Sequence, residues 1–183
     1  IDSKNLLKKI SEIDDRIRLI LNEKNIGVGA SRNKAIDICK GEYIAFCDCD
    51  DLWEINKLEI QLKFMKDLNA DFSFTSYNII DEKTKKIGLR NAKNMINYDQ
   101  LIASCDIGLS TVVLNKKIFN KNCKFAELKT KEDYVLWLKL SKLGVKMFGL
   151  NRFLSNWRKS NRSLSSSTVQ KLFDGFRVYR HYM

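Results

Sequence analysis

The chain has 183 residues, of which 44% are hydrophobic, so it can bury a core and is not an intrinsically disordered chain. Lys and Arg outnumber Asp and Glu by 33 to 22, and the net charge of +11 favours an anionic partner: nucleic acid, a phosphorylated small molecule or an acidic membrane face. The five cysteines have no disulfide-like spacing and the one histidine is His181, which favours reduced thiols in a cytoplasmic protein over a zinc site. No apolar run approaches the ~20 residues that a membrane-spanning helix needs.

Helix and strand patterns alternate through the first part of the chain. Such alternation favours an α/β fold in which a mostly parallel, Rossmann-like sheet is flanked by crossover helices. The expected elements are a helix over 3–13, a strand over 16–22, a helix over 30–39, a strand over 41–48, a helix over 54–68 and a strand over 70–80.

The second part of the chain is predicted to add shorter elements and one well-marked helix. That helix covers 131–144, because its apolar residues recur at helical spacing and Gly144 ends the pattern. The other expected elements are a helix over 98–104, strands over 109–115, 145–150 and 153–158, a loop over 158–167 and a terminal helix over 168–182.

Three carboxylates, Asp48, Asp50 and Asp51, follow directly on the apolar run at 43–47. In open α/β sheets, ligands bind beyond the carboxyl ends of the strands, so a ligand is expected here. Carboxylates that converge repel one another unless a cation lies between them, and oxygen ligands without histidine suit Mg²⁺ or Mn²⁺. Such an ion would join the protein to the phosphates of a polyanionic ligand. The alternative is that the acidic residues, Asp51 above all, cap the helix that follows.

The segment NIGVGASRNKAIDICKGEYIAFCDCDDLWEINKLEIQL (25–62) resembles the nucleotide-sugar-binding half of the bacterial family 2 glycosyltransferases, which have the GT-A fold. In that family an N-x-G-x-x-x-x-R-N segment leads through a helix to G-E-Y-I and then to D-x-D-D-x-W. The positions that match in order are Asn25, Gly27, Arg32, Asn33, Gly41 to Ile44, Asp48, Asp50, Asp51 and Trp53.

The resemblance extends over nearly the whole chain. KEDYVLWLKL (131–140) is similar to the family's E-D helix, DIGLSTVVLNKKIF (106–119) to the segment between the two motifs, and WRKSNRSLSSS (157–167) to a variable acceptor loop. This resemblance implies one continuous GT-A domain, in which residues 1–98 are what this chain contains of the donor-binding half. Residues 99–183 are then the acceptor-binding half with its C-terminal loop and helix.

One departure from the family lies at the N-terminus. The family opens with a strand and later carries D-D-G-S-x-D, and only Asp2 matches the end of that segment. The resemblance therefore implies that the opening strand and most of the D-D-G-S-x-D segment lie upstream of Ile1. A chain without them is expected to bind donor poorly or to be inactive.

The resemblance implies an inverting glycosyltransferase (a hexosyltransferase) that moves a sugar from a nucleoside-diphosphate sugar, UDP-linked, to a hydroxyl of a glycan or lipid-linked acceptor. The setting is synthesis of bacterial surface polysaccharide such as lipopolysaccharide or capsule. Mn²⁺ or Mg²⁺ is the implied cofactor, and no nucleic acid is involved. The enzyme is expected in the cytoplasm, with peripheral contact to the anionic inner face of the plasma membrane, although the basic surplus would equally serve solubility.

The resemblance also assigns roles to residues. Asp50 matches the metal ligand, Asp48 a residue near the ribose or the metal, and Arg32 an arginine that contacts the nucleotide. Asp133 matches the general base that takes the proton of the acceptor hydroxyl. The expected supporting residues are Asp51, Glu132 and Trp53.

Simpler interpretations of the same residues stay open. Glu132 and Asp133 would also favour a helix N-terminus, and Arg32 would also suit a solvated position. For the whole chain, the alternatives are a basic nucleic-acid-binding module and a metal-dependent nucleotidyltransferase. The first lacks a striped basic surface, and the second lacks a counterpart of the KEDY motif at 131–134.

Overall fold

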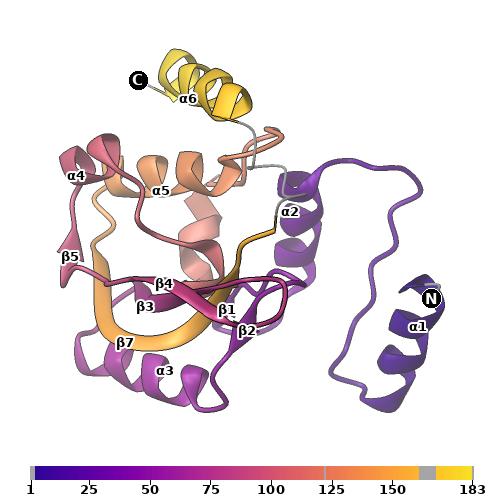
Figure 1. The fold of residues 1–183 in the computed structure, drawn as a ribbon. Coiled ribbons are helices and arrows are strands. Elements are labelled where there is room, and N and C mark those ends of the chain that lie inside the picture. The colour runs from indigo at the N-terminus through magenta and orange to yellow at the C-terminus, as the bar shows by residue number, and fades with distance from the viewer. Residues whose placement is uncertain (1–2, 122, 161–167, 183) are drawn as a thin grey trace.

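The computed structural model describes residues 3–121, 123–160 and 168–182, in which helices cover both faces of one curled sheet (Figure 1). Helix α3 lies on one face, and α2, α4 and α5 lie on the other, with α6 above α5. The helices are α1 (Ser3–Ile13), α2 (Val28–Ile38), α3 (Lys57–Asp67), α4 (Tyr98–Ala103), α5 (Glu132–Lys142) and α6 (Thr168–Tyr182), with 3₁₀ turns η1 (Leu109–Thr111) and η2 (Lys116–Lys121).

Within the described residues, seven strands form the sheet in the order β1-β6-β3-β7-β2, with β4 paired to β3 and β5 paired to β7. The longest ladder, between β3 and β7, is parallel, and the other five pairs are antiparallel. The strands are β1 (Tyr43–Ala45), β2 (Leu52–Trp53), β3 (Phe72–Ile80), β4 (Lys86–Arg90), β5 (Met95–Ile96), β6 (Val113–Asn115) and β7 (Met147–Arg158).

The α/β class predicted from the sequence is confirmed, and parallel pairing is found at the centre of the described sheet. The antiparallel pairs involve short strands around that centre. Strand β4, for example, follows β3 through the tight turn at 81–85, and a strand that returns through a tight turn must run antiparallel.

Three of the predicted strands differ in detail from the structure. The strands predicted over 145–150 and 153–158 are one strand, β7, whose register on β3 shifts where Thr75 pairs with Leu150 and Ser76 pairs with Phe153. The extra residues between these pairs form a bulge, so the break in the apolar pattern marks an irregularity and not a strand end. The strand predicted over 109–115 begins with the turn η1, and only β6 is extended.

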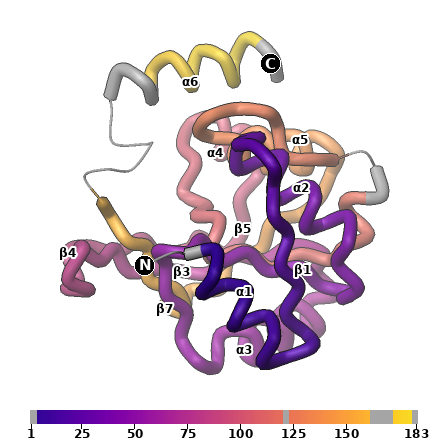
Figure 2. Tube along the Cα trace, turned by 90° about the vertical axis from the view of Figure 1, so that its right-hand side faces the viewer, coloured from indigo at the N-terminus to yellow at the C-terminus, as the bar shows by residue number. Residues whose placement is uncertain are grey.

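The strand predicted over 16–22 is absent. The segment between α1 and α2 is irregular, and its apolar side chains Ile17, Ile20 and Leu21 are 42%, 37% and 52% exposed. Figures 1 and 2 show it running along the outside of the sheet and helices. A strand requires a neighbour that accepts and donates backbone hydrogen bonds, and no described strand pairs with this segment.

The main core lies between the sheet and helix α5. Trp137 of α5 is fully buried, and its ring meets Phe72 at 5.0 Å and Phe125 at 6.4 Å between centroids, both in edge-on geometry. Gly144 has φ 83° and follows the end of α5, as the sequence predicted. This packing fixes the first turn of α5 beside the ends of the strands. None of the described helices is long and apolar enough to cross a membrane.

Candidate active site

A cavity of about 560 Å³ opens where the strands meet helices α5 and α6. Its wall combines the end of β1, much of the segment 102–111, the start of α5 and one side of α6. Asp48 and Asp133, far apart in the sequence, both line it, together with Tyr77, Trp157 and Tyr179. A cavity of this size with convergent acidic groups has the features of a ligand site.

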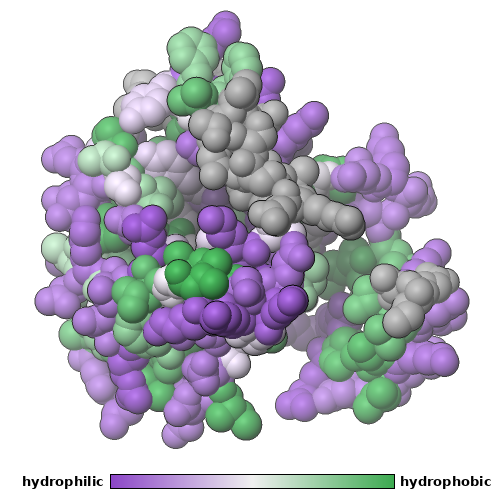
Figure 3. Space-filling view, in the orientation of Figure 1, coloured by the Kyte–Doolittle hydropathy of each residue, from purple (hydrophilic) through white to green (hydrophobic). Residues whose placement is uncertain are grey.

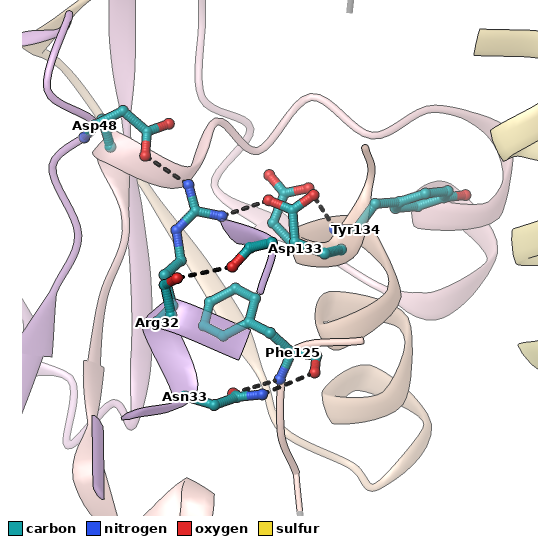
Figure 4. A network of polar contacts seen from close by, with 10 residues as sticks. Arg32, Asn33, Asp48, Phe125, Asp133 and Tyr134 are labelled. Carbon is teal, nitrogen blue, oxygen red and sulfur yellow. Dashed lines mark hydrogen bonds and ion pairs between the residues drawn. The ribbon is translucent and has the colours of Figure 1, made fainter. Parts of the chain in front are cut away.

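Arg32 of α2 holds two carboxylates together at the edge of this cavity (Figure 4). Its Nη2 lies 2.6 Å from Asp48 Oδ1, and its Nη1 donates to Glu132 Oε1. The Arg32 side chain is only 15% exposed, and its guanidinium lies 5.5 Å from the centre of the Phe125 ring. A solvated position for Arg32 is therefore wrong: the cation joins α2, the end of β1 and α5.

The sequence around Arg32 explains its position. Gly27 has φ 82°, a conformation that favours glycine, and begins α2. Gly29 lies so close to the chain that a Cβ there would approach the Ala126 carbonyl oxygen to 2.5 Å. Asn33 then exchanges two hydrogen bonds with the Phe125 backbone, at 2.9 and 3.0 Å. These contacts hold α2 against the segment before α5, and in this position the Arg32 side chain reaches Asp48 and Glu132.

Asp51 is not a helix cap. It is buried, and its Oδ1 accepts a 2.9 Å hydrogen bond from the backbone N–H of Arg158 in β7, whereas α3 begins only at Lys57. Burial raises the pKa of Asp51 to about 6, although a hydrogen bond with Ser110 opposes the rise. Asp51 thus ties the acidic loop to the sheet.

Asp50 is exposed and is not part of the cavity wall. Its backbone carbonyl accepts a 2.9 Å hydrogen bond from Arg158 Nε, which fixes the loop while the carboxylate remains at the surface. Among the described side chains, no three metal-ligating groups converge. One or two carboxylates are, however, what Mg²⁺ uses when substrate phosphates and water supply the remaining oxygens. The acidic loop fits a cation shared with a phosphorylated ligand and does not fit a metal cage made of protein alone.

Asp133 is the second residue of α5 and is half-buried in the cavity wall. Burial, and next the nearby charge of Glu132, raise the pKa of Asp133 to about 6, while the Tyr134 N–H, which donates to Asp133 Oδ1 at 2.7 Å, opposes the rise. A carboxylate with this pKa is mainly ionised at neutral pH and is a stronger base than an exposed one. The geometry suits a general base.

Ser110 is the main site residue that was not predicted from the sequence. Its hydroxyl accepts the Asp48 N–H at 3.0 Å, and its carbonyl accepts from Trp53 Nε1 at 2.7 Å and from Ser155 Oγ at 3.1 Å. Trp53 therefore does not line the cavity but holds Ser110, which does. The only sequence signal for Ser110 was its place in the segment 106–119.

Lys57 and Gln61 of helix α3 form a buried polar layer behind Ser110. Lys57 Nζ donates to Gln61 Oε1 at 2.5 Å and lies 4.7 Å from the centre of the Trp53 ring. Gln61 Nε2 donates to the Thr111 carbonyl at 2.9 Å. Burial lowers the pKa of Lys57 to about 8. The two residues fix turn η1, and hence Ser110, against α3.

The C-terminal part contributes Trp157, which lines the cavity, and Arg158, which holds the acidic loop. The remainder of the predicted acceptor loop, at 161–167, and the side chain of His181 lie outside the described residues.

Substitution of Arg32 tests how much its ion pairs with Asp48 and Glu132 contribute to stability. In Arg32→Met, the carboxylates of Asp48 and Glu132 lose their shared cation, so we expect the free energy of unfolding to fall by roughly 2–3 kcal/mol. Urea unfolding at pH 7 measures this loss. The control is Lys34→Met on the same helix, where an exposed side chain should change stability by less than about 0.5 kcal/mol. If the free energy of unfolding fell no further in Arg32→Met than in Lys34→Met, the ion pairs of Arg32 would contribute no stability.

Known proteins are similar to this chain in sequence. The family model described as Glycosyl transferase family 2 matches residues 2–126. TuaG of Bacillus subtilis (strain 168), whose name assigns it to teichuronic acid biosynthesis as a glycosyltransferase, is 32% identical across 97% of this chain and 71% of its own length. WfgD of Escherichia coli, named as a UDP-Glc:alpha-D-GlcNAc-diphosphoundecaprenol beta-1,3-glucosyltransferase, is 36% identical across 93% of this chain and 67% of its own length.

A solved structure has the same fold. The crystal structure of S. aureus TarS 1-349 in complex with UDP-GlcNAc matches with a TM-score of 0.73 at 19% sequence identity. The match covers 96% of this chain and 52% of the TarS 1-349 chain, so the present chain spans about half the length of that solved chain. The likeness confirms the fold that the sequence implied.

Proposed function

The chain belongs to glycosyl transferase family 2, and from that premise we propose that it transfers a hexose, with inversion, from a UDP-linked donor to a hydroxyl of a lipid-linked glycan. The observation that carries the proposal is one cavity lined by both Asp133, with its raised pKa, and Asp48, at the end of β1. The relatives support the choice of substrates, since the name of WfgD specifies UDP-Glc and a diphosphoundecaprenol-linked sugar. Family membership also favours this reaction over a nucleic-acid-binding module or a nucleotidyltransferase.

Residues 1–98 form the donor side in this proposal. Arg32 and its partner Asp48 would contact the nucleotide, and the carboxylates of Asp50 and Asp48 would hold Mn²⁺ or Mg²⁺ together with the donor diphosphate. Such an ion, when bound, acts as a Lewis acid that stabilises the departing diphosphate. Asp51 and Arg158 keep the acidic loop on the sheet, so the loop is already in position before the donor arrives.

Residues 99–183 form the acceptor side. The acceptor hydroxyl gives its proton to the Asp133 carboxylate while its oxygen bonds to the anomeric carbon from the face opposite the leaving group. The bond between that carbon and the diphosphate oxygen breaks, and its electron pair leaves with the diphosphate. Asp133 suits this step because its raised pKa makes it a better proton acceptor while it is still ionised at neutral pH.

The biological setting follows from the relatives' names. TuaG is assigned to teichuronic acid and WfgD to a diphosphoundecaprenol-linked acceptor, both components of bacterial envelope polysaccharide synthesis. We place this chain in the same kind of pathway, with lipopolysaccharide or capsule as the product class. A lipid-linked acceptor would require the protein to work at the inner, anionic face of the plasma membrane, and the charge of +11 suits that surface.

A donor panel tests the proposal. Full-length protein is incubated with UDP-, GDP- and dTDP-hexoses, with and without Mn²⁺ or Mg²⁺, and release of nucleoside diphosphate is measured. We expect release from one or more UDP-sugars, only with the metal present and stimulated by a lipid-diphosphate acceptor. Turnover of none of the donors, or release that is independent of metal, would refute the proposed donor chemistry.

A further inference from the structure

Helix α6 presents an apolar stripe to solvent. We define the α6 stripe as Leu172, Phe173 and Phe176, which are 71%, 62% and 67% exposed. Their spacing places them on one side of the helix, and Figure 3 shows hydrophobic side chains at the top of the molecule, over α6. Exposed phenylalanines at neighbouring positions are unusual for a surface that meets only water, and such patches mark interaction sites.

The opposite side of α6 is fixed to the body of the protein. Asp174 and Val178 are buried, with 0% and 1% exposure, and the Thr130 hydroxyl donates a hydrogen bond to Asp174. At the flank of the helix, between its buried side and the stripe, Tyr179 Oη donates to the Ile102 carbonyl at 3.3 Å. Because these contacts hold one face of the helix, the α6 stripe is directed outward and not toward the core.

Cations accompany the stripe. Arg177 and Arg180 are exposed and follow Phe173 and Phe176 by four positions, so both start from the part of the helix that carries the stripe. Arg177 also pairs with Asp174 at 3.5 Å. Exposed aromatics alternating with arginines are typical of helices that lie in the plane of an anionic membrane. There the rings enter the acyl boundary and the guanidinium groups meet the lipid phosphates.

Helix α6 is also a wall of the active-site cavity. Gly175 and Tyr179 line the same cavity as Asp133, on the sides of the helix next to the stripe. In Figure 1, α6 lies over α4 and α5, at the end of the molecule remote from α3. A membrane bound to the stripe would therefore lie next to the cavity that contains the proposed base.

We propose that the α6 stripe docks the protein on an anionic lipid surface and thereby presents the cavity to an acceptor whose lipid tail stays in the bilayer. The docking surface is inferred from exposure and charge alone, while its purpose rests on the proposed function. Two aromatic side chains, one leucine and two arginines act together, so removing the rings should weaken binding sharply and added salt should weaken it further.

Vesicle sedimentation tests the docking. Full-length protein is mixed with vesicles of phosphatidylcholine containing phosphatidylglycerol, or of phosphatidylcholine alone, and the bound fraction is measured at low and high salt. We expect binding to the anionic vesicles, a fall of at least about tenfold in partitioning for the double variant Phe173→Ser and Phe176→Ser, and a smaller fall for Arg180→Gln. The matched control is Ile55→Ser with Leu68→Ser, two exposed apolar residues beside α3.

Several results would overturn the docking: no binding of the wild type to anionic vesicles, equal binding of the double variant and the control, or a dimer in sedimentation equilibrium that only the double variant disrupts. Circular dichroism shows whether each variant is folded. The assay contains neither donor nor acceptor glycan, so its result does not depend on whether the proposed function is correct. Protein that ignores vesicles yet transfers sugar to a soluble acceptor refutes the docking alone, and protein that binds vesicles without turning over any donor refutes the proposed function.

Discussion

Asp133→Asn is expected to lower kcat by about 10²–10⁴-fold while leaving the donor KM nearly unchanged. The substitution keeps the size of the side chain but removes the group that accepts the acceptor proton. Asp133 lines the cavity and is not ion-paired with Arg32, which binds Asp48 and Glu132 and acts on Asp133 only through its charge, so donor binding should persist. Initial rates over a range of donor concentrations, at saturating acceptor, measure both constants.

The pH dependence of the wild type gives the second readout of Asp133. The pKa of Asp133 is raised to about 6, and only the ionised form accepts a proton. The rate should therefore rise with pH through about 6 and level off above it, and this limb should disappear in Asp133→Asn. A profile that is flat between pH 5 and 8 in the wild type would contradict the assignment of Asp133 as the base.

The effect of Asp133→Asn on folding stability distinguishes a general base from a residue that only stabilises the N-terminus of α5. Because the folded-state pKa of Asp133 lies above its ordinary value, its contribution to stability is fully present below pH 3.8 and is lost as pH rises through about 6. Asn is neutral throughout, so Asp133→Asn should not lower the melting temperature at pH 7. The control is Asp99→Asn, an exposed acid at the same position of α4, which should lose a few tenths of a kcal/mol and no activity.

Asp50→Asn should reduce transfer by roughly 10³-fold or more, since the Lewis-acid contribution of a metal ion to such a reaction is worth several kcal/mol. The Asp50 carboxylate is exposed beside the cavity, and its loop is fixed through the Asp50 carbonyl and Asp51, so the variant should fold normally. The measurement is a Mn²⁺ titration of the transfer rate, together with calorimetric titration of Mn²⁺ in the presence of UDP.

Asp67→Asn, an exposed acid at the end of α3, is the matched control and should leave both titrations unchanged. Activation by Mn²⁺ that is the same in Asp50→Asn and the wild type would remove Asp50 from the metal site. If calorimetry showed normal Mn²⁺ binding but transfer were lost, Asp50 would act on the substrate and not on the ion.

Helices were predictable where the apolar period was clear, because a helix makes its hydrogen bonds within its own segment. The helices predicted over 54–68 and 131–144 contain α3 and α5. Strands depend on partners that lie elsewhere in the sequence. The apolar run at 16–22 forms no strand because no described strand pairs with it, and β7 continues through a bulge because β3 supports both of its halves.

The convergence of Arg32, Asp48, Glu132 and Asp133 was implied by resemblance to the family, and the structure brings them together. Propensity alone would have assigned these acids to helix termini. The partner through which Asp51 supports the acidic loop could not be predicted, because Arg158 lies 107 residues away and is brought to Asp51 only by the pairing of β2 with β7.

A crystal of the full-length protein grown with UDP and Mn²⁺ tests the central claim most directly. We expect anomalous density for one ion that contacts both the Asp50 carboxylate and the diphosphate, with the nucleotide beyond the end of β1 and the diphosphate directed into the cavity that Asp133 lines. An ion bound elsewhere, or a nucleotide outside this cavity with the Asp50 carboxylate in solvent, would contradict the account.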